Sequence, residues 1–225
     1  PGGGWKPQEK WAWNRICLGK IVNLSWFKDE AQDIAPYECD TKQAKSWPSH
    51  SVLSDRFLQL IVRHSRYSRL IQDSGVRIRC AKYENWINLS NARLDWPIGL
   101  HGSVFERGVD ISDLVSVSTL SFVRSTFDGP FNAIRLEAGG GLFMSGKASF
   151  QAVNLFGAKV GGDLAIAGST FEGLFNADGL EVGGHLFMDG EASFQAVNLL
   201  GVKVGGDLAI AGSTFEGLFN ADGLE

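Results

Sequence analysis

The sequence predicts an all-β repeat fold: a parallel β-helix with about 22 residues per coil, preceded by an α-helical N-terminal cap. Apolar residues recur at every eleventh position from Val76 to Phe219, and the residue two places after each of them is apolar or small. From Gly146 onward a glycine follows each pair at the same interval. An apolar–x–apolar unit is typical of a short strand with one buried face, and glycine marks the corner after it.

The residue between the paired apolar positions indicates that one coil takes 22 residues rather than 11. Every second unit has Asn or Asp there, whereas the intervening units have Arg77, Gly99, Ser121 and other types. Coils of a parallel β-helix lie about 4.8 Å apart, so these side chains are expected to form a hydrogen-bonded ladder worth about 1 kcal/mol per bond. The predicted ladder residues are Asn88, Asp110, Asn132, Asn154, Asn176, Asn198 and Asn220.

Residues 1–75 are expected to cap the first coil, because a solenoid leaves unpaired strand edges and apolar columns at its ends. The segment from Pro7 to the residue before Gly19 reads as a helix, with proline in its first turn and glycine as its stop. Residues 20–27 are interpreted as a short strand or an extended segment. Residues 28–50 are polar and are expected to form a loop that wraps around the domain.

Residues 52–72 predict a second, amphipathic helix with an N-cap at Ser51 or Ser54 and an end at Gly75. Its polar side is a candidate docking surface for an acidic partner, and a solvated helix face is the alternative. The four basic residues on that side are Arg56, Arg63, Arg66 and Arg69.

Residues 76–225 then form a solenoid of about 6.8 coils, for which the usual bias of parallel connections predicts a right-handed sense. Residues 150–181 and 194–225 differ only at 156/200 and 158/202, which indicates a duplicated pair of coils. Glu225 corresponds to Glu181 in the middle of a coil. We therefore expect a solenoid truncated at its C-terminal end, or an open end that stacks on a partner. The start at PGGGW is interpreted as a trimmed edge.

Charge and cysteine content indicate which classes of partner and which cellular compartment the sequence favours. Residues 1–139 carry 18 Lys and Arg against 15 Asp and Glu, and residues 140–225 carry 3 against 10. The chain lacks the basic excess of a nucleic-acid-binding protein and any apolar stretch long enough for a membrane span. Three widely spaced cysteines (Cys17, Cys39 and Cys80) argue against a disulfide framework, and they favour a reducing compartment and a cytoplasmic location.

One pattern of residues in the sequence is a candidate for binding or catalysis. The four histidines lack metal-ligand spacing, and the glycine pairs match no phosphate-binding loop, so neither a metal nor a cofactor is expected. Steps of 22 produce a column of acids and aromatics that could bind a sugar or a cation. The repetitive surface should nevertheless give its acids similar environments, unlike a paired-carboxylate hydrolase. The column consists of Glu106, Asp128, Phe150, Glu172, Phe194 and Glu216.

Two segments carry a resemblance to known proteins. GAKVGGDLAIAGSTFEG (157–173) and GLEVGGHLFMDGEASF (179–194) look like the Gly-Gly-x-Leu units of a diffuse group of bacterial β-solenoid proteins. The resemblance covers roughly residues 50–225 and implies the architecture but no activity. The period of five of pentapeptide-repeat proteins divides neither 11 nor 22, which argues against that family.

The predicted function is a non-catalytic β-solenoid scaffold or protein-interaction module. It would bind a protein partner, or a second copy through the open end, with its arginines and with Glu106, Asp128, Glu172 and Glu216 as the candidate surface. The alternative is a carbohydrate-binding or carbohydrate-active β-helix that uses the acid–aromatic column. A third hypothesis, acidic mimicry of nucleic acid by the C-terminal half, is weakened because the acids form no continuous double row.

Overall fold

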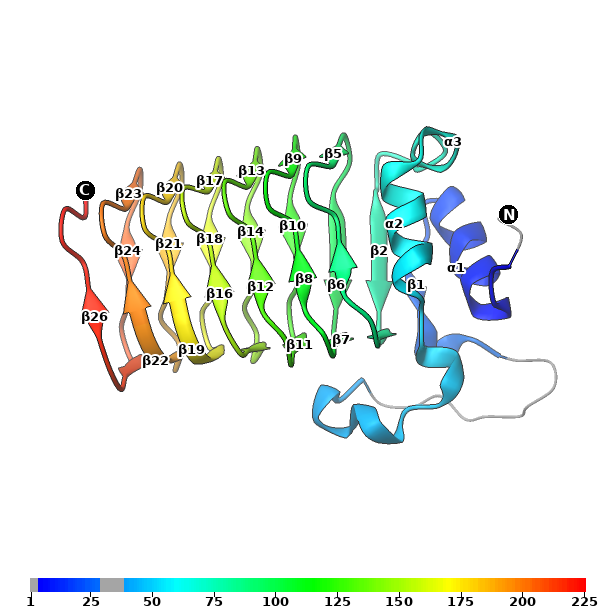
Figure 1. The fold of residues 1–225 in the computed structure, drawn as a ribbon, viewed down its shortest axis with the longest axis horizontal. Coiled ribbons are helices and arrows are strands. Elements are labelled where there is room, and N and C mark those ends of the chain that lie inside the picture. Colours follow the sequence, from blue (N-terminus) through cyan, green and yellow to red (C-terminus); the bar gives the residue numbers. More distant parts are fainter. Residues whose placement is uncertain (1–3, 29–38) are drawn as a thin grey trace.

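The computed structural model describes residues 4–28 and 39–225 of the 225-residue chain. It is a parallel β-solenoid of about seven coils with helices at its N-terminal end, which confirms the predicted fold class (Figure 1). The first four coils have four short strands each, where the sequence pattern indicated two, and coils five to seven have three each. The strands of successive coils stack into four faces along the rod. The second and third faces merge into one sheet, because β19 and β22 each run through both.

The strand bounds are as follows. The first face contains β1 (Val22–Asn23), β2 (Val76–Arg79), β6 (Ile98–His101), β10 (Leu120–Ser121), β14 (Leu142–Phe143), β18 (Leu164–Ala165), β21 (Leu186–Phe187) and β24 (Leu208–Ala209). The second contains β3 (Lys82–Tyr83), β7 (Val104–Phe105), β11 (Thr126–Phe127), β15 (Ser149–Phe150), β19 (Thr170–Asn176), β22 (Ser193–Asn198) and β25 (Thr214–Phe215). The third adds β4 (Ile87–Asn88), β8 (Val109–Asp110), β12 (Phe131–Asn132), β16 (Val153–Asn154) and β26 (Phe219–Asn220). The fourth contains β5 (Arg93–Leu94), β9 (Val115–Ser116), β13 (Glu137–Ala138), β17 (Lys159–Val160), β20 (Glu181–Val182) and β23 (Lys203–Val204).

Helices and 3₁₀ turns make up most of the N-terminal region. Pro7 opens the first helix as predicted, and Gly19 follows its end with φ +63°. The predicted helix over 52–72 is wrong as one element, because it breaks at His64. The backbone of His64 is extended there, and its ring Nδ1 accepts a hydrogen bond from Arg66 N that starts a separate short helix. The elements are α1 (Pro7–Cys17), η1 (Leu24–Trp26), η2 (Thr41–Ser46), η3 (Ser49–Ser51), α2 (Asp55–Arg63) and α3 (Ser65–Ser68).

The N-terminal region meets the edge of the first coil face by face. On the first face β1 pairs in parallel with β2, and on the second Val52 forms a single parallel bridge to Lys82. On the third face the Arg63 guanidinium takes the place of a strand: it donates to the carbonyl oxygens of Asn88 and Ser90 at 3.2 and 2.7 Å. Unpaired strand groups are costly when they are buried, so these contacts stabilise the end of the rod.

Parallel pairing at an offset of 22 residues joins each coil to the next. Leu120 pairs with Ile98 on one side and with Leu142 on the other, and the first, third and fourth faces keep this offset. The second face keeps it only over the first three coils: from Phe127 onward its offset alternates between 23 and 21, since Phe150 pairs with Phe127 and with Phe171. One extra corner residue, compensated by a shorter link to the third face, produces this shift. The two changes cancel within one coil, so the eleven-residue spacing of apolar residues in the sequence does not reveal the shift.

The extra corner residue explains why the sequence repeats every 44 residues. Coils with the longer corner turn through Gly146 and Lys147 or through Gly190 and Glu191, all with positive φ. The coil that follows has a short corner, where Ser169 Oγ donates to Met144 O in the longer corner at 2.9 Å. Ser213 makes the equivalent bond to Met188 O. Two kinds of coil alternate, and each kind satisfies polar groups of the other.

A stack of seven aromatic rings, one from each coil, fills the interior behind the second face. Neighbouring ring centroids lie 4.5 to 5.2 Å apart, with interplanar angles of 1 to 12°. Each buried aromatic ring removes a large apolar area from water, so the stack contributes strongly to the stability of the rod. Its members are Tyr83, Phe105, Phe127, Phe150, Phe171, Phe194 and Phe215.

The predicted ladder forms over four of its seven members. Asn176 Nδ2 donates to Asn154 Oδ1 at 3.2 Å, Asn198 Nδ2 donates to Asn176 Oδ1 at 3.0 Å, and Asn220 Nδ2 donates to Asn198 Oδ1 at 3.2 Å. Asn132 lies in register below Asn154. Each bond joins one coil to the next on the outer side of the third face.

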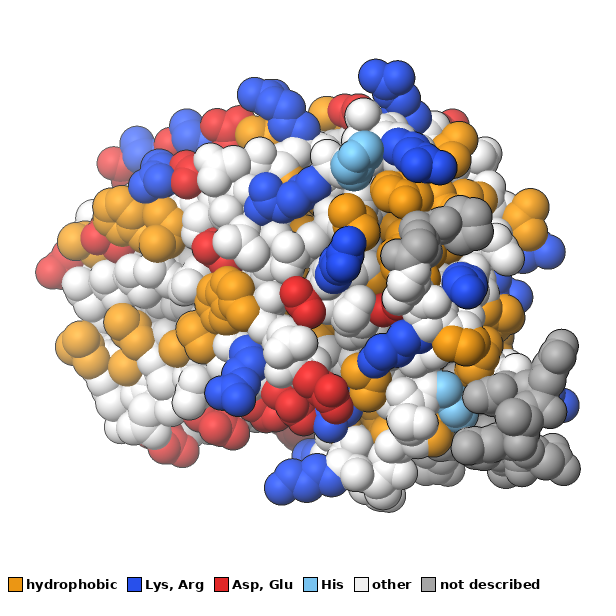
Figure 2. All heavy atoms as spheres, turned by 45° about the vertical axis from the view of Figure 1, so that its right-hand side comes forward, with side chains coloured by type: hydrophobic (Ala, Val, Ile, Leu, Met, Phe, Trp, Pro, Cys, Tyr) orange, Lys and Arg blue, Asp and Glu red, His pale blue; other side chains and the backbone are white. Residues whose placement is uncertain are grey.

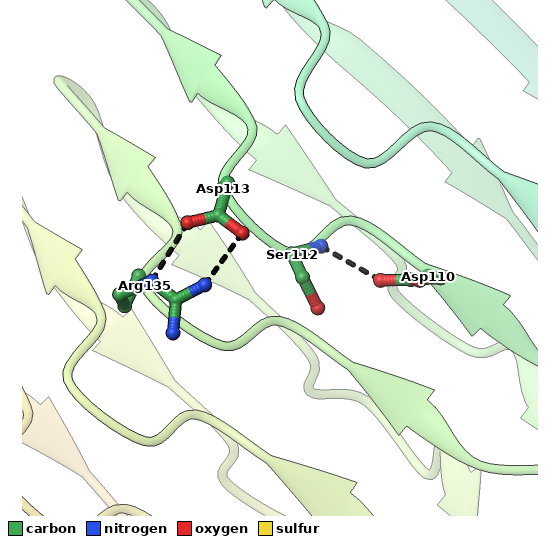
Figure 3. A network of polar contacts seen from close by, with 4 residues as sticks. All are labelled: Asp110, Ser112, Asp113 and Arg135. Carbon is green, nitrogen blue, oxygen red and sulfur yellow. Dashed lines mark hydrogen bonds and ion pairs between the residues drawn. The ribbon is translucent and has the colours of Figure 1, made fainter.

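In the first two coils the ladder residues bind other groups. Asn88 Oδ1 accepts from Arg63 Nη2 at 2.9 Å and from Ser90. Asp110 Oδ1 accepts from the N–H of Ser112 at 2.9 Å, as Figure 3 shows. A carboxylate has no hydrogen to donate along a ladder. An Asx turn of this kind suits Asn and Asp alike, which explains why both occur in the column.

The glycine pairs at the corner that follows the fourth face of each coil have a steric cause. A side chain at Gly161, Gly183 or Gly205 would collide with the carbonyl oxygen of the glycine one coil earlier. The Gly-Gly-x-Leu pattern is therefore needed for coils to approach closely at this corner.

We expect Phe171→Ala to lower the free energy of unfolding by about 3 to 5 kcal/mol, because the substitution opens a cavity in the aromatic stack. Phe156→Ala is the matched control, since Phe156 is 45 % exposed and Phe171 only 2 %. The control should cost about 1 kcal/mol or less. Urea unfolding followed by circular dichroism measures both. Equal losses for the two variants would contradict the structural role of the stack.

Candidate functional site

A segment of the N-terminal region, residues 39–51, lies alongside the second face; we call it the strap (Figure 1). A disulfide joins Cys39 to Cys80 at the first corner of coil one, with a Cα–Cα distance of 5.1 Å. Further along, Thr126 Oγ1 donates to Thr41 Oγ1 at 2.8 Å. The strap also buries Ala44 and Trp47 in a small apolar cluster with Val104. These contacts fix the strap over coils one to three.

The disulfide corrects the expectation drawn from the cysteines. Cys17 is the free cysteine, and the other two pair across 41 residues of sequence. The sequence hides this pairing, because only the return of the strap onto the first coil brings Cys39 beside Cys80. Structural disulfides persist mainly in oxidising environments, so the cysteines no longer support the expected cytoplasmic location.

A groove runs between the strap and the second face, and we call it the strap groove. It consists of a cleft of about 320 Å³ that adjoins a wider hollow of about 870 Å³. Lys42 and Lys45 of the strap face a row of solenoid hydroxyls, one per coil, at Thr126, Ser149 and Thr170. Four carboxylates line the same groove, those of Glu106, Asp128 and Glu172 on the solenoid and that of Asp40 on the strap. Figure 2 shows acidic and basic side chains intermingled along the lower edge of the molecule.

The predicted acid–aromatic column is wrong in its aromatic members. The alternating offset on the second face places Phe150 and Phe194 in the buried stack, where both are 0 % exposed. Gln151 and Gln195 take their places on the outside of the rod. A surface column of exposed aromatics for sugar stacking is therefore not formed by these residues. The outer column reads Glu106, Asp128, Gln151, Glu172, Gln195 and Glu216.

Within the groove, two carboxylates one coil apart have unlike environments. Glu106 forms an ion pair with Lys82 at 2.8 Å, and this hydrogen bond raises the pKa of the lysine. Partial burial raises the pKa of Asp128, and the negative charge of Glu106 adds to this rise, against the opposing charges of Lys45 and Lys82. The expectation that a repetitive surface gives each acid the same environment is wrong here, because the strap covers one end of the column.

The four arginines predicted as a docking surface separate into two groups. Arg63 is bound to the first coil and serves as part of the cap. Arg56, Arg66 and Arg69 are exposed, and the guanidinium of Arg66 lies 5.9 Å from the ring centroid of Tyr67. Arg56 and Arg63 line a shallow hollow of about 440 Å³ with other residues of α2.

A second pocket, of about 400 Å³, lies at the corner between the first and second faces, and we call it the corner pocket. Its lining includes Asn23, Arg79, His101, Arg124 and the Cys39–Cys80 disulfide. The sequence gives no sign of this pocket, because its residues come from β1, three successive coils and the strap. Nothing in the 22-residue period marks this meeting of segments.

His101 lies half-buried in the corner pocket, with Nε2 2.8 Å from Ser121 Oγ. Burial lowers its pKa, and the nearby positive charge of Arg79 lowers it further. The chemistry offered by these sites is the binding of charged and polar groups. Among residues 4–28 and 39–225, no group of three or more His, Cys, Asp or Glu side chains is arranged to hold a metal ion.

In the part of the chain that the structure describes, no helix is long and apolar enough to cross a membrane. No family model, curated protein or solved structure matches the chain.

We expect the fold to lose stability as the pH falls through the ordinary pKa of histidine, about 6.5. The folded-state pKa of His101 is lowered, so the unfolded chain takes up the proton first and its free energy falls relative to the folded state. His101→Gln should reduce the loss of unfolding free energy between pH 7.5 and pH 5. An NMR titration should show that Arg79→Gln moves the pKa of His101 toward its usual range. An unchanged pKa would contradict the stated role of Arg79.

Reduction of the Cys39–Cys80 disulfide should lower the free energy of unfolding by about 2 to 4 kcal/mol and should raise hydrogen exchange in residues 41–51. A Cys39→Ser/Cys80→Ser variant should behave like the reduced protein. Cys17→Ser is the control and should leave both measurements unchanged. If reduction leaves strap exchange unaltered, the other strap contacts alone hold it in place.

Proposed function

We propose that the chain is a non-catalytic binding scaffold, a rigid β-solenoid that presents the strap groove to a protein partner. The observation that supports this most directly is the strap itself. It turns one end of a uniform face into a groove, and a disulfide and a hydrogen bond hold it there. The groove offers lysines, carboxylates and hydroxyls together, which suits the polar surface of a protein.

The rod suits a scaffold because its inward side chains stabilise the fold, whereas its outward side chains are available for binding. Inward side chains are constrained by the coils on both sides, whereas outward positions are free to vary. In the duplicated coils, Phe156 and Leu200 differ in type and are both partly exposed. The one buried pair that differs, Ala158 and Val202, changes only between small apolar residues. A binding surface can therefore change without disturbing the interior.

A carbohydrate ligand is the second candidate, favoured by one observation. Glu106 and Asp128 lie in the groove in unlike environments, beside the row of hydroxyls. Carbohydrate hydrolysis uses two carboxylates in unlike environments, so these two residues would serve as the pair.

Site-specific photo-crosslinking in the native host tests the proposal. A photoreactive residue replaces Ser149 in the groove, and a matched one replaces Lys203 on the fourth face. We expect a discrete protein adduct from position 149 and none from position 203. A third position, Ile210, should yield a product of twice the chain mass if the protein self-associates.

Identical labelling at positions 149 and 203, or none at either, would contradict a partner site in the groove. Release of reducing sugars from a polysaccharide panel would support the second candidate instead. That activity should be lost in Asp128→Asn and kept in Glu216→Gln, because Glu216 belongs to the same column but lies in the last coil.

A further inference from the structure

The corner pocket gathers positive charge from separate parts of the chain. Arg79 ends β2, His101 ends β6 in register with it, and Arg124 occupies the corner after β10 with φ +59°. Within residues 4–28 and 39–225, the lining of the pocket contains no Asp or Glu. Among the described residues, neither Arg79 nor Arg124 forms an ion pair.

Neutral donors complete the lining. Asn23 Oδ1 accepts hydrogen bonds from the N–H and the hydroxyl of Ser25 at 3.1 and 2.9 Å. This orientation leaves the Nδ2 amide group of Asn23 as its available donor. His101 Nε2 is engaged by Ser121, which leaves the Nδ1 side of the ring available. The pocket therefore offers two guanidinium groups, an amide and an imidazole.

The surroundings of the pocket extend this positive charge. Arg124 also lines the wider hollow of the strap groove, where Lys42 and Lys147 lie. Among the described strap residues, Asp40 is the acid that lines this hollow, and its carboxylate already accepts from the N–H of Lys42 and from Gln43 Nε2. Glu172 lines the same hollow from the fifth coil. These acids therefore lie outside the corner pocket, whereas Arg79 and Arg124, which form no ion pair with a described residue, line it.

We propose that the corner pocket binds an oxyanion group, a phosphate or a carboxylate, held between the guanidinium groups of Arg79 and Arg124. A guanidinium presents its N–H groups in a planar fork that matches two oxygens of such an anion. Asn23 and His101 contribute further hydrogen bonds. The site adjoins the proposed partner groove and shares Arg124 with it, but its test does not depend on that function.

The disulfide forms one wall of the pocket, so the redox state of the chain should affect binding. Cys39 belongs to the strap and Cys80 immediately follows Arg79. Reduction frees the strap from the corner and removes the restraint beside that arginine. The oxidised protein is therefore the form that holds the pocket in its binding geometry.

Isothermal titration of the full, oxidised chain with inorganic phosphate and, separately, with succinate tests the proposal at low ionic strength. We expect saturable binding of at least one anion, and the stronger of the two identifies whether phosphate or carboxylate is the preferred group. Arg79→Gln and Arg124→Gln should each weaken binding at least tenfold. Arg93→Gln is the matched control on the fourth face and should leave the affinity unchanged. Reduction of the disulfide should weaken binding severalfold.

Absence of saturable binding to both anions would overturn the proposal. Equal weakening by Arg93→Gln would also overturn it, since the effect would then come from net charge alone. Circular dichroism and urea unfolding verify that each variant folds. If Arg124→Gln fails to fold because of its corner conformation, Arg124→Lys replaces it: the charge is kept, the fork is lost, and binding should still weaken.

Discussion

Each coil of the solenoid pairs with the previous coil through parallel strands, and the aromatic stack requires the same distance between coils as this pairing does. Rings 4.5 to 5.2 Å apart match the spacing of neighbouring strands, so one ring per coil fills the interior without a gap. A coil of different length would misplace its ring and its strands together. The constraint therefore acts on the number of residues in a coil and on the position of every corner.

Corner chemistry follows from that constraint. The chain turns within a few residues, and the corner residue takes positive φ in coil after coil: Asn91, Asp113 and Arg135 early in the rod, and Gly157, Gly179 and Gly201 later. At these early corners the residues with positive φ carry side chains, and two of these side chains interact across neighbouring coils. Arg135 Nε forms an ion pair with Asp113 Oδ1 at 2.7 Å (Figure 3). The pair is exposed and contributes little energy, so the turn itself determines the residue choice.

Asymmetry enters the rod through the N-terminal region. The strap and β1 approach a repetitive surface at one end only, and they create environments that no single coil has. Asp128 and Glu106 acquire different surroundings, and Arg79 and Arg124 line a pocket to which the described residues contribute no acid. In a repeat protein, chemistry that requires unlike neighbours arises where a segment outside the repeat meets it. Both candidate sites lie at that meeting place, and the disulfide holds the segment in position.

The sequence by itself determined the fold class, the coil length of 22 and the ladder column, because each coil repeats the same buried positions. The first helix and the glycine corners were predictable for the same local reason. The tertiary structure decided the rest. A corner that is longer by one residue and a link that is shorter by one residue leave the spacing of eleven unchanged. Only the strand pairing therefore showed that Phe150 and Phe194 are buried. The disulfide, the strap groove and the corner pocket depend on contacts between residues far apart in the sequence, and no periodic pattern records those contacts.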